Sequence, residues 1–97
     1  MATYILLSSL TDEGRKTIKG RPERILEVNK ELEAMGARVI DQYAVLGPYD
    51  FVSVVDAVDN ETIARISVEL GARGTIQITT MPAISVSDFI ERLKAAP

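Results

Sequence analysis

Tyr49 and Asp50 follow one another in a turn-forming segment, residues 47–50, that reads Gly-Pro-Tyr-Asp. A carboxylate beside a phenol can act as a general base next to a hydrogen-bond donor, or both groups can converge on a polar ligand. The same residues also suit a plain turn, because Pro48 fixes one backbone angle and an Asp side chain accepts hydrogen bonds from nearby backbone N–H groups. A third interpretation has Asp50 anchoring a basic segment earlier in the chain. All three stay open.

That basic segment holds five of the eleven basic residues within ten positions, residues 15–24. Lys16 and Lys19 are three residues apart and therefore share one side of a helical turn. Arg24 lies near the start of a predicted helix, whose N-terminus favours anions. The segment is either an electropositive lip that attracts a carboxylate or phosphate, or an ordinary solvated charged surface.

Two further tyrosines, Tyr4 and Tyr43, lie on predicted strands. They are either core residues with a hydrogen-bonded hydroxyl or donors in an apolar cleft suited to an aromatic or quinone-like ligand. Asp50, Tyr49 and Tyr43 are the catalytic candidates. The predicted ligand-binding set is Tyr4, Lys16, Lys19, Arg24, Tyr43, Tyr49 and Asp50.

Composition removes several classes of chemistry. The chain has no Cys and no His, so neither a Ser-His-Asp nor a Cys-His arrangement can be built, and zinc or copper sites lack their usual ligands. We expect no metal and no cofactor. The formal net charge of −3 argues against general nucleic-acid binding, and no apolar run is long enough to span a bilayer. We expect a cytoplasmic protein without membrane contact.

The 97 residues suit one domain, residues 1–97. Apolar periodicity, Thr11 as a helix cap, and glycines at helix ends define the elements. The predicted order is strand 4–7, a short helical turn 11–20, helix 22–36, strands 38–46 and 51–55 as a hairpin, a helix from 59 or 60 to 71 or 74, strand 75–81 ended by Pro82, and a last helix capped by Ser85 or Ser87.

This order, βαββαβ with a C-terminal helix, predicts the α+β ferredoxin-like fold with a four-stranded antiparallel sheet and both long helices on one face. Strict alternation in strand 38–46 puts Val39, Tyr43 and Val45 on one face and Ile40 and Leu46 on the other. Because both faces carry large apolar side chains, we expect a second copy to cover the face without helices. The simpler alternative is that protein surfaces carry much apolar area.

Three segments together resemble the GYD-domain family over nearly the whole chain: TDEGRKTIKGRPER at 11–24, LGPYDFV at 46–52 and TTMPA at 79–83. The Gly-x-Tyr-Asp pattern that names the family falls on Gly47, Tyr49 and Asp50. The family is similar to the dimeric α/β-barrel proteins, in which two ferredoxin-like protomers join their sheets. That resemblance implies a homodimer or higher oligomer with a cleft.

The resemblance does not choose a chemistry, since the superfamily includes muconolactone isomerase, small cofactor-free monooxygenases and effector-binding modules of transcription regulators. Many of its enzymes use a His near the cleft, and haem-binding members need an axial ligand, which this chain lacks. We predict a protein that binds a small organic or anionic ligand in a cleft between sheet and helices. The alternatives are a cofactor-free isomerase or monooxygenase, and a structural or regulatory assembly protein.

Overall fold

The computed structural model describes residues 1–95 and contains four strands and four helices within them. The element order confirms the predicted α+β ferredoxin-like fold with its C-terminal helix. In chain order the elements are β1 (Ala2–Leu10), α1 (Asp12–Gly20), α2 (Arg24–Ala34), β2 (Ala37–Ala44), β3 (Phe51–Ala57), α3 (Asn60–Gly71), β4 (Ile76–Ala83) and α4 (Val86–Lys94).

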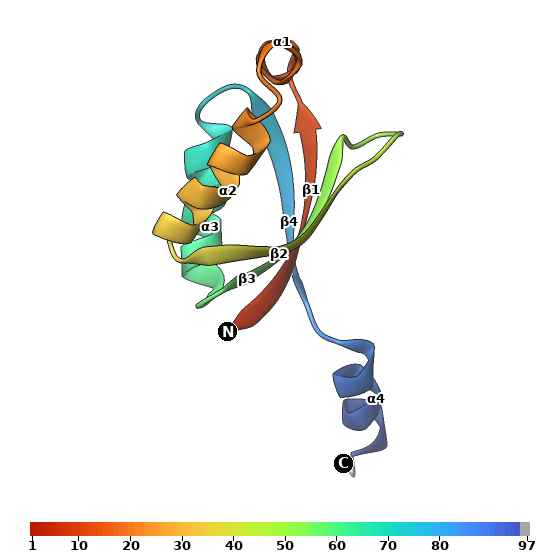
Figure 1. The fold of residues 1–97 in the computed structure, drawn as a ribbon. Coiled ribbons are helices and arrows are strands. Elements are labelled where there is room, and N and C mark those ends of the chain that lie inside the picture. The colour runs from red at the N-terminus through yellow and green to blue at the C-terminus, as the bar shows by residue number, and fades with distance from the viewer. Residues whose placement is uncertain (96–97) are drawn as a thin grey trace.

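The four strands form one antiparallel sheet in the order β2-β3-β1-β4. The central strands β1 and β3 pair over most of their length, from Ala2 opposite Ala57 to Ser8 opposite Phe51. Helices α2 and α3 lie side by side on one face of the sheet, whereas α4 projects away from the body of the molecule (Figure 1). The helices therefore cover only one of the two sheet faces.

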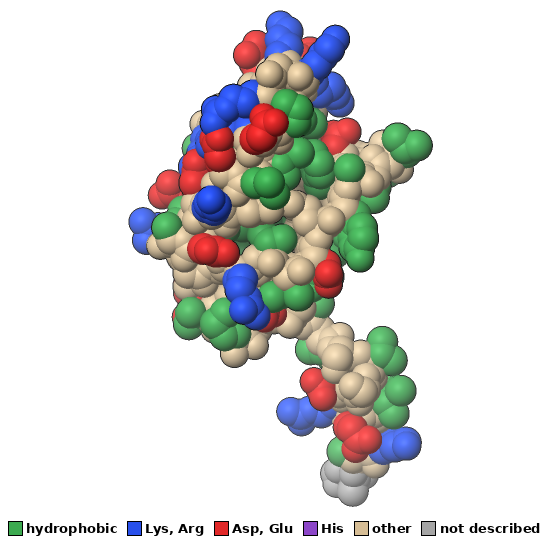
Figure 2. Space-filling view, viewed as in Figure 1, with side chains coloured by type: hydrophobic (Ala, Val, Ile, Leu, Met, Phe, Trp, Pro, Cys, Tyr) green, Lys and Arg blue, Asp and Glu red, His purple; other side chains and the backbone are tan. Residues whose placement is uncertain are grey.

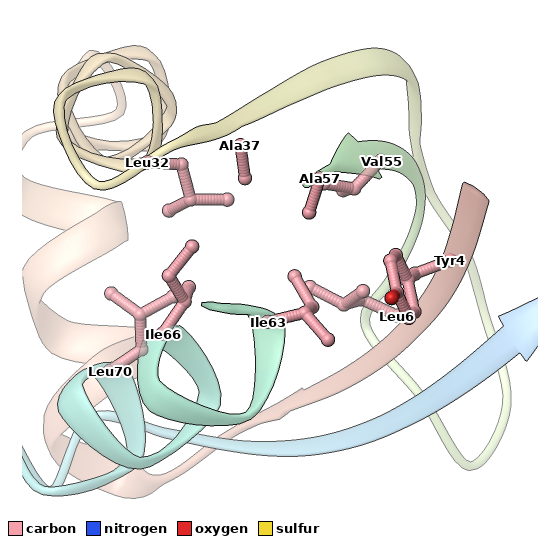
Figure 3. Close-up of a cluster of buried hydrophobic side chains, with 9 residues drawn as sticks. All are labelled: Tyr4, Leu6, Leu32, Ala37, Val55, Ala57, Ile63, Ile66 and Leu70. Carbon is pink, nitrogen blue, oxygen red and sulfur yellow. The ribbon is translucent and has the colours of Figure 1, made fainter. Parts of the chain in front are cut away.

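The hydrophobic core lies between that sheet face and the two long helices (Figure 3). Alternate residues of the central strands point into it, because side chains on a strand alternate between faces. Helices α2 and α3 contribute apolar residues at spacings of three and four, as an amphipathic helix requires. The core residues are Tyr4, Leu6, Leu32, Ala37, Val55, Ala57, Ile63, Ile66 and Leu70.

Helix ends are set by short-range hydrogen bonds that the sequence signals. Thr11 and Asp59 accept hydrogen bonds from Gly14 N and Thr62 N and cap α1 and α3. Ser85 caps α4 in the same way. Gly36 follows α2 with φ of 101°, a left-handed conformation that only glycine adopts without strain.

Two details of the predicted strands were wrong. A β-bulge shifts the register in β2, so that Val39 pairs with Val55 whereas Asp41 pairs with Val54. The extra residue breaks the strict alternation, and Val39 and Tyr43 lie on opposite faces of the sheet. Pro82 does not end the last strand but pairs with Tyr4 inside β4. Because β4 is an edge strand, a residue without an N–H is tolerated there.

The short helix α1 is fixed to the loop that follows α3. Thr11 N donates to Thr75 O at 3.1 Å, and Thr11 Oγ1 donates to Gly74 O at 2.8 Å. Gly14 is buried at this contact, and a Cβ there would overlap the Thr75 carbonyl oxygen. The absence of a side chain at position 14 is therefore what lets α1 lie this close to the loop.

We expect Gly14→Ala to lower the free energy of unfolding by about 1–3 kcal/mol, because the added methyl group meets backbone that cannot move aside freely. Gly20→Ala, at the far end of α1, is the matched control, since a Cβ there has no atom within 4 Å. Its effect should stay within about 0.5 kcal/mol. Urea denaturation followed by circular dichroism measures both, and equal effects would contradict a tight contact at Gly14.

Candidate functional site

The Gly-Pro-Tyr-Asp turn joins the β2–β3 hairpin to the end of β1. Leu10 N donates to Asp50 Oδ2 at 2.7 Å, and Asp50 N donates to Ser8 O at 2.8 Å. Ser9 Oγ donates to the Pro48 carbonyl at 3.1 Å. Within residues 1–95, Asp50 forms no ion pair with a basic residue. Its carboxylate thus braces the backbone of β1 rather than the basic segment.

The three tyrosines lie in different places. Tyr4 is buried in the core, where its hydroxyl donates to Asn60 Oδ1 at 2.6 Å. Burial, with smaller contributions from the negative charges of Asp59 and Glu61, raises the pKa of Tyr4 and keeps the phenol protonated. Tyr43 is 61% exposed on the sheet face without helices, opposite Val52. Tyr49 is half-buried in the turn.

The seven predicted ligand-binding residues therefore do not meet at one site. Lys16 and Lys19 are exposed on α1, where Lys16 lies 3.9 Å from Glu13. Of the seven, only Arg24 lines the cavity described next, and Tyr4 lines a separate, more open depression between α3 and β4.

A cavity of about 280 Å³ lies between the helix-covered sheet face and helices α1, α2 and α3. Figure 2 shows apolar side chains in this region between α2 and the β2–β3 hairpin, bordered by charged side chains of α1 and α2. The volume is close to the lower end of small-molecule sites. The apolar lining comes from six strands and helices and consists of Leu10, Ile18, Ile25, Val28, Phe51, Leu70 and Ile76.

Besides the hydroxyl groups of Ser8, Thr17 and Thr75, two polar clusters line the cavity. Asn29 and Gln42 exchange amide hydrogen bonds of 2.8 and 3.4 Å, and Gln42 also donates to Ser53 Oγ at 3.1 Å. Arg24 and Arg73 both line the cavity and both contact Glu31 on α2. The cavity therefore combines an apolar wall with an uncharged amide pair and two guanidinium groups.

Glu31 joins α2 to the loop after α3. Arg24 Nη1 lies 2.9 Å from Glu31 Oε1, and Arg73 Nη1 lies 2.5 Å from the buried Oε2, which has no other partner among the described residues. The contact with Arg73, helped by that with Arg24, lowers the pKa of the Glu31 carboxyl against the opposing effect of burial. Arg73 was not among the predicted site residues, because an isolated basic residue after a helix gives no signal of its own in the sequence.

The sheet face without helices is apolar at its centre. Ile5 and Leu7 of β1 pair with Val54 and Val52 of β3, and these residues alternate with the buried ones. The chain exposes 6694 Å², compared with about 5,500 Å² for a compact monomer of this mass. The excess of about 1,200 Å² is larger than the roughly 800 Å² that one partner buries in a standard protein–protein interface, and the projecting helix α4 contributes to it.

Helix α4 is the second uncovered apolar surface. Val86, Phe89, Ile90 and Leu93 recur at spacings of three and four, and none of the helix's nine residues is buried. The molecule extends 54 Å along its longest axis, with α4 projecting at the end opposite α1 (Figure 1). Leu46, at the tip of the β2–β3 hairpin, is fully exposed.

The GYD domain family profile matches residues 4–93 of this chain. The chain belongs to the GYD-domain family. A relative from Thermus thermophilus, named "Glutamine synthetase and cystathionine beta-lyase binding protein", is 56% identical over 95 residues. The match covers 97% of this chain and 100% of that relative. The family resemblance seen in the sequence is thus confirmed.

Solved structures share the fold of this GYD-domain protein. The crystal structure of FFRP-DM1 matches with a TM-score of 0.59 and 26% identity, over 87% of this chain and 100% of that one. That of TTHA0845 from Thermus thermophilus matches with a TM-score of 0.54 and 22% identity, over 100% and 99% of the two chains. The second likeness concerns the fold alone.

Other kinds of site are not found in the part of the chain that the structure describes. Residues 1–95 hold no group of three or more acidic side chains placed to bind a metal ion. No helix among these residues has both the length and the apolar composition needed to cross a membrane.

Asp50→Ala is expected to lower the free energy of unfolding by about 1–3 kcal/mol, because the Leu10 N–H loses a charged acceptor. Asp50→Asn should cost less, since its carbonyl oxygen can accept the same hydrogen bond. Chemical denaturation of both variants tests whether the hydrogen bond from Leu10 N to the Asp50 side chain stabilises the fold. If neither variant loses stability, the Asp50 carboxylate does not hold β1.

The pH dependence of stability in the Glu31→Gln variant tests whether the ion-paired carboxylate stabilises the fold. Because the pKa of Glu31 is lower in the folded state than its ordinary value of 4.5, the carboxylate stabilises the fold above that pH. This stabilisation is lost as the pH falls through the folded-state pKa. We expect the stability difference between wild type and Glu31→Gln to be largest near pH 7 and to shrink below pH 4.5.

Glu69→Gln is the control for this measurement, because Glu69 forms an exposed, 3.8 Å ion pair with Arg65 on α3. Its effect should be small at every pH. Urea titrations at several pH values measure both variants. A stability difference for Glu31→Gln that does not change with pH would rule out the ion-paired carboxylate as its cause.

Proposed function

We propose that this protein is a homo-oligomeric binding protein that docks on a metabolic enzyme. Glutamine synthetase and cystathionine β-lyase are the candidate partners, because a relative that is 56% identical is named for binding them. That relative is covered over 100% of its length, so its binding surface must have a counterpart within this chain. This supports a contact between proteins as the main activity.

The observation that carries the proposal is the exposed apolar stripe of α4. Val86, Phe89, Ile90 and Leu93 stand at i, i+3, i+4 and i+7, the spacing with which an amphipathic helix fills a groove on its partner. A helix of nine residues is too short to be stable in water unless its apolar side packs against something. Because none of residues 1–95 covers the stripe, we propose that α4 binds the enzyme.

The open sheet face is assigned to a second copy of the chain. Ile5, Leu7, Val52 and Val54 form a continuous apolar centre on the two middle strands. Arg38 and Asp56, which pair with each other across β2 and β3, border it with opposite charges. A twofold axis would bring such a border against its own complement. The family resemblance supports the same occupant.

A second candidate function is the binding of a small ligand in the cleft between sheet and helices, favoured by the cavity of about 280 Å³. The isomerase or monooxygenase alternative has less support. Neither Asp50 nor Tyr43 nor Tyr49 lines that cavity, and the Asp50 carboxylate is bonded to Leu10 N. A base must reach the proton that it removes.

Phe89→Asp should weaken binding to glutamine synthetase from the same organism by more than about tenfold. The substitution places a charge in the apolar stripe, and buried aromatic anchors commonly account for about 2 kcal/mol or more of an interface. Biolayer interferometry with the immobilised enzyme measures the effect, and cystathionine β-lyase is tested in parallel.

Val68→Asp is the matched control, because Val68 is an isolated apolar residue of α3 that is 72% exposed. It should leave enzyme binding unchanged. Light scattering after size exclusion should give the wild-type oligomer for Phe89→Asp and a smaller species for Val54→Lys on the sheet face. Unchanged enzyme binding by Phe89→Asp would overturn the role of α4, and so would dissociation of the oligomer.

A further inference from the structure

The cavity beneath α1 has features that indicate which kind of molecule would fill it. Its apolar lining residues, such as Ile18, Ile25 and Phe51, are only partly buried, so they present uncovered hydrocarbon to the cavity. A compact core leaves few voids larger than a water molecule. Filling this space with an apolar group would therefore stabilise the protein that surrounds it.

One hydroxyl group in the cavity makes no side-chain hydrogen bond to the described residues. Ser8 lines the cavity and is only 6% exposed, and its hydroxyl takes part in none of the side-chain hydrogen bonds among the described residues. By contrast, the amides of Asn29 and Gln42 satisfy each other. Because Ser8 Oγ is not among the fully buried atoms that lack a partner, this hydroxyl is accessible to a ligand atom or water in the cavity.

Charge at the edge of the cavity does not cancel. Three guanidinium groups form ion pairs with only two carboxylates there, which leaves one positive charge in excess. The cluster consists of Arg21 with Glu27, Arg24 with Glu27 and Glu31, and Arg73 with Glu31. Two of its members, Arg24 and Arg73, also line the cavity. Each guanidinium has five N–H donors, so both can bind a further anion while they hold Glu31.

We propose that this cavity binds a small amphiphilic monoanion, a carboxylic acid with a hydrocarbon or aromatic body. The body lies against Ile18, Ile25 and Phe51, and the carboxylate lies at Arg24 and Arg73. This inference rests on the second candidate function, that the cavity takes a small ligand. It adds the charge and the polarity of that ligand and the two residues that recognise them.

The charge balance favours a monoanion over a phosphate ester. One added negative charge neutralises the cluster, whereas a dianion would leave an uncompensated charge next to Glu31. The cavity also lacks the glycine-rich backbone that usually cradles phosphate. A planar carboxylate, in contrast, matches the fork of a guanidinium group.

Octanoate and uncharged 1-octanol are the two probes, because they share a hydrocarbon chain and differ in charge. Isothermal titration calorimetry on the full-length protein should give an octanoate affinity about tenfold higher than that of 1-octanol, decreasing as salt is added. Arg73→Gln should weaken octanoate about tenfold and leave 1-octanol unchanged, because the substitution removes a positive charge but keeps an amide N–H that can donate to Glu31 Oε2. Arg65→Gln, on the exposed side of α3, should change neither.

Two filling variants, Val28→Phe and Ile18→Phe, should abolish the binding of both probes. Circular dichroism confirms that each variant is folded, and having two of them, on different helices, protects the test against the failure of one. If both probes bind equally well and Arg73→Gln has no effect, the anion inference is overturned while ligand binding in the cavity stands. If neither probe binds, or if binding survives in a folded filling variant, both are overturned.

Discussion

A chain of this length supplies two long helices, and two helices cover only one face of a four-stranded sheet. This limit determines most of the other features. The side chains of β1 and β3 that point toward α2 and α3 form the core together with residues of those helices, from Tyr4 to Leu70. The side chains of β1 and β3 that point the other way, such as Ile5 and Val54, are not covered by any helix among residues 1–95. An apolar sheet face of this kind is stable in water only when something else buries it.

The third helix of the body, α1, is too short to extend the core, and it closes one end of the helix layer instead. Its N-terminus is bonded to the loop after α3 through Thr11, and Gly14 allows the contact. Glu31 connects the same loop to α2 through Arg73. The cavity lies between these two connections, where α1 spans the end of the layer without filling it. A packed interior would need larger side chains at positions such as Val28.

The sequence predicted the fold well because its signals are local. Thr11, Gly36 and Asp59 mark helix ends through contacts within a few residues, and periodicity gives the remaining elements. The bulge at Ile40 and the pairing of Pro82 were missed, since both depend on which strand lies alongside. The site was harder still. The cavity brings together residues from eight segments, and neither the burial of Ser8 nor the meeting of Arg24 with Arg73 leaves a mark in the sequence.

The cavity and the apolar stripe of α4 lie toward opposite ends of the molecule, and β4 runs between them. Ile76 begins β4 and lines the cavity, whereas Ala83 ends it just before α4. The backbone of β4 is hydrogen-bonded to β1 alone, because β4 is an edge strand, and the Thr80 hydroxyl adds a 2.7 Å hydrogen bond to Ser67 of α3. The cavity lining includes no residue of α4, so β4, which runs from the cavity toward α4, is the most direct connection between the two. Coupling through this connection needs β4 to shift against β1 as a unit, since packed elements move between discrete arrangements rather than deform smoothly.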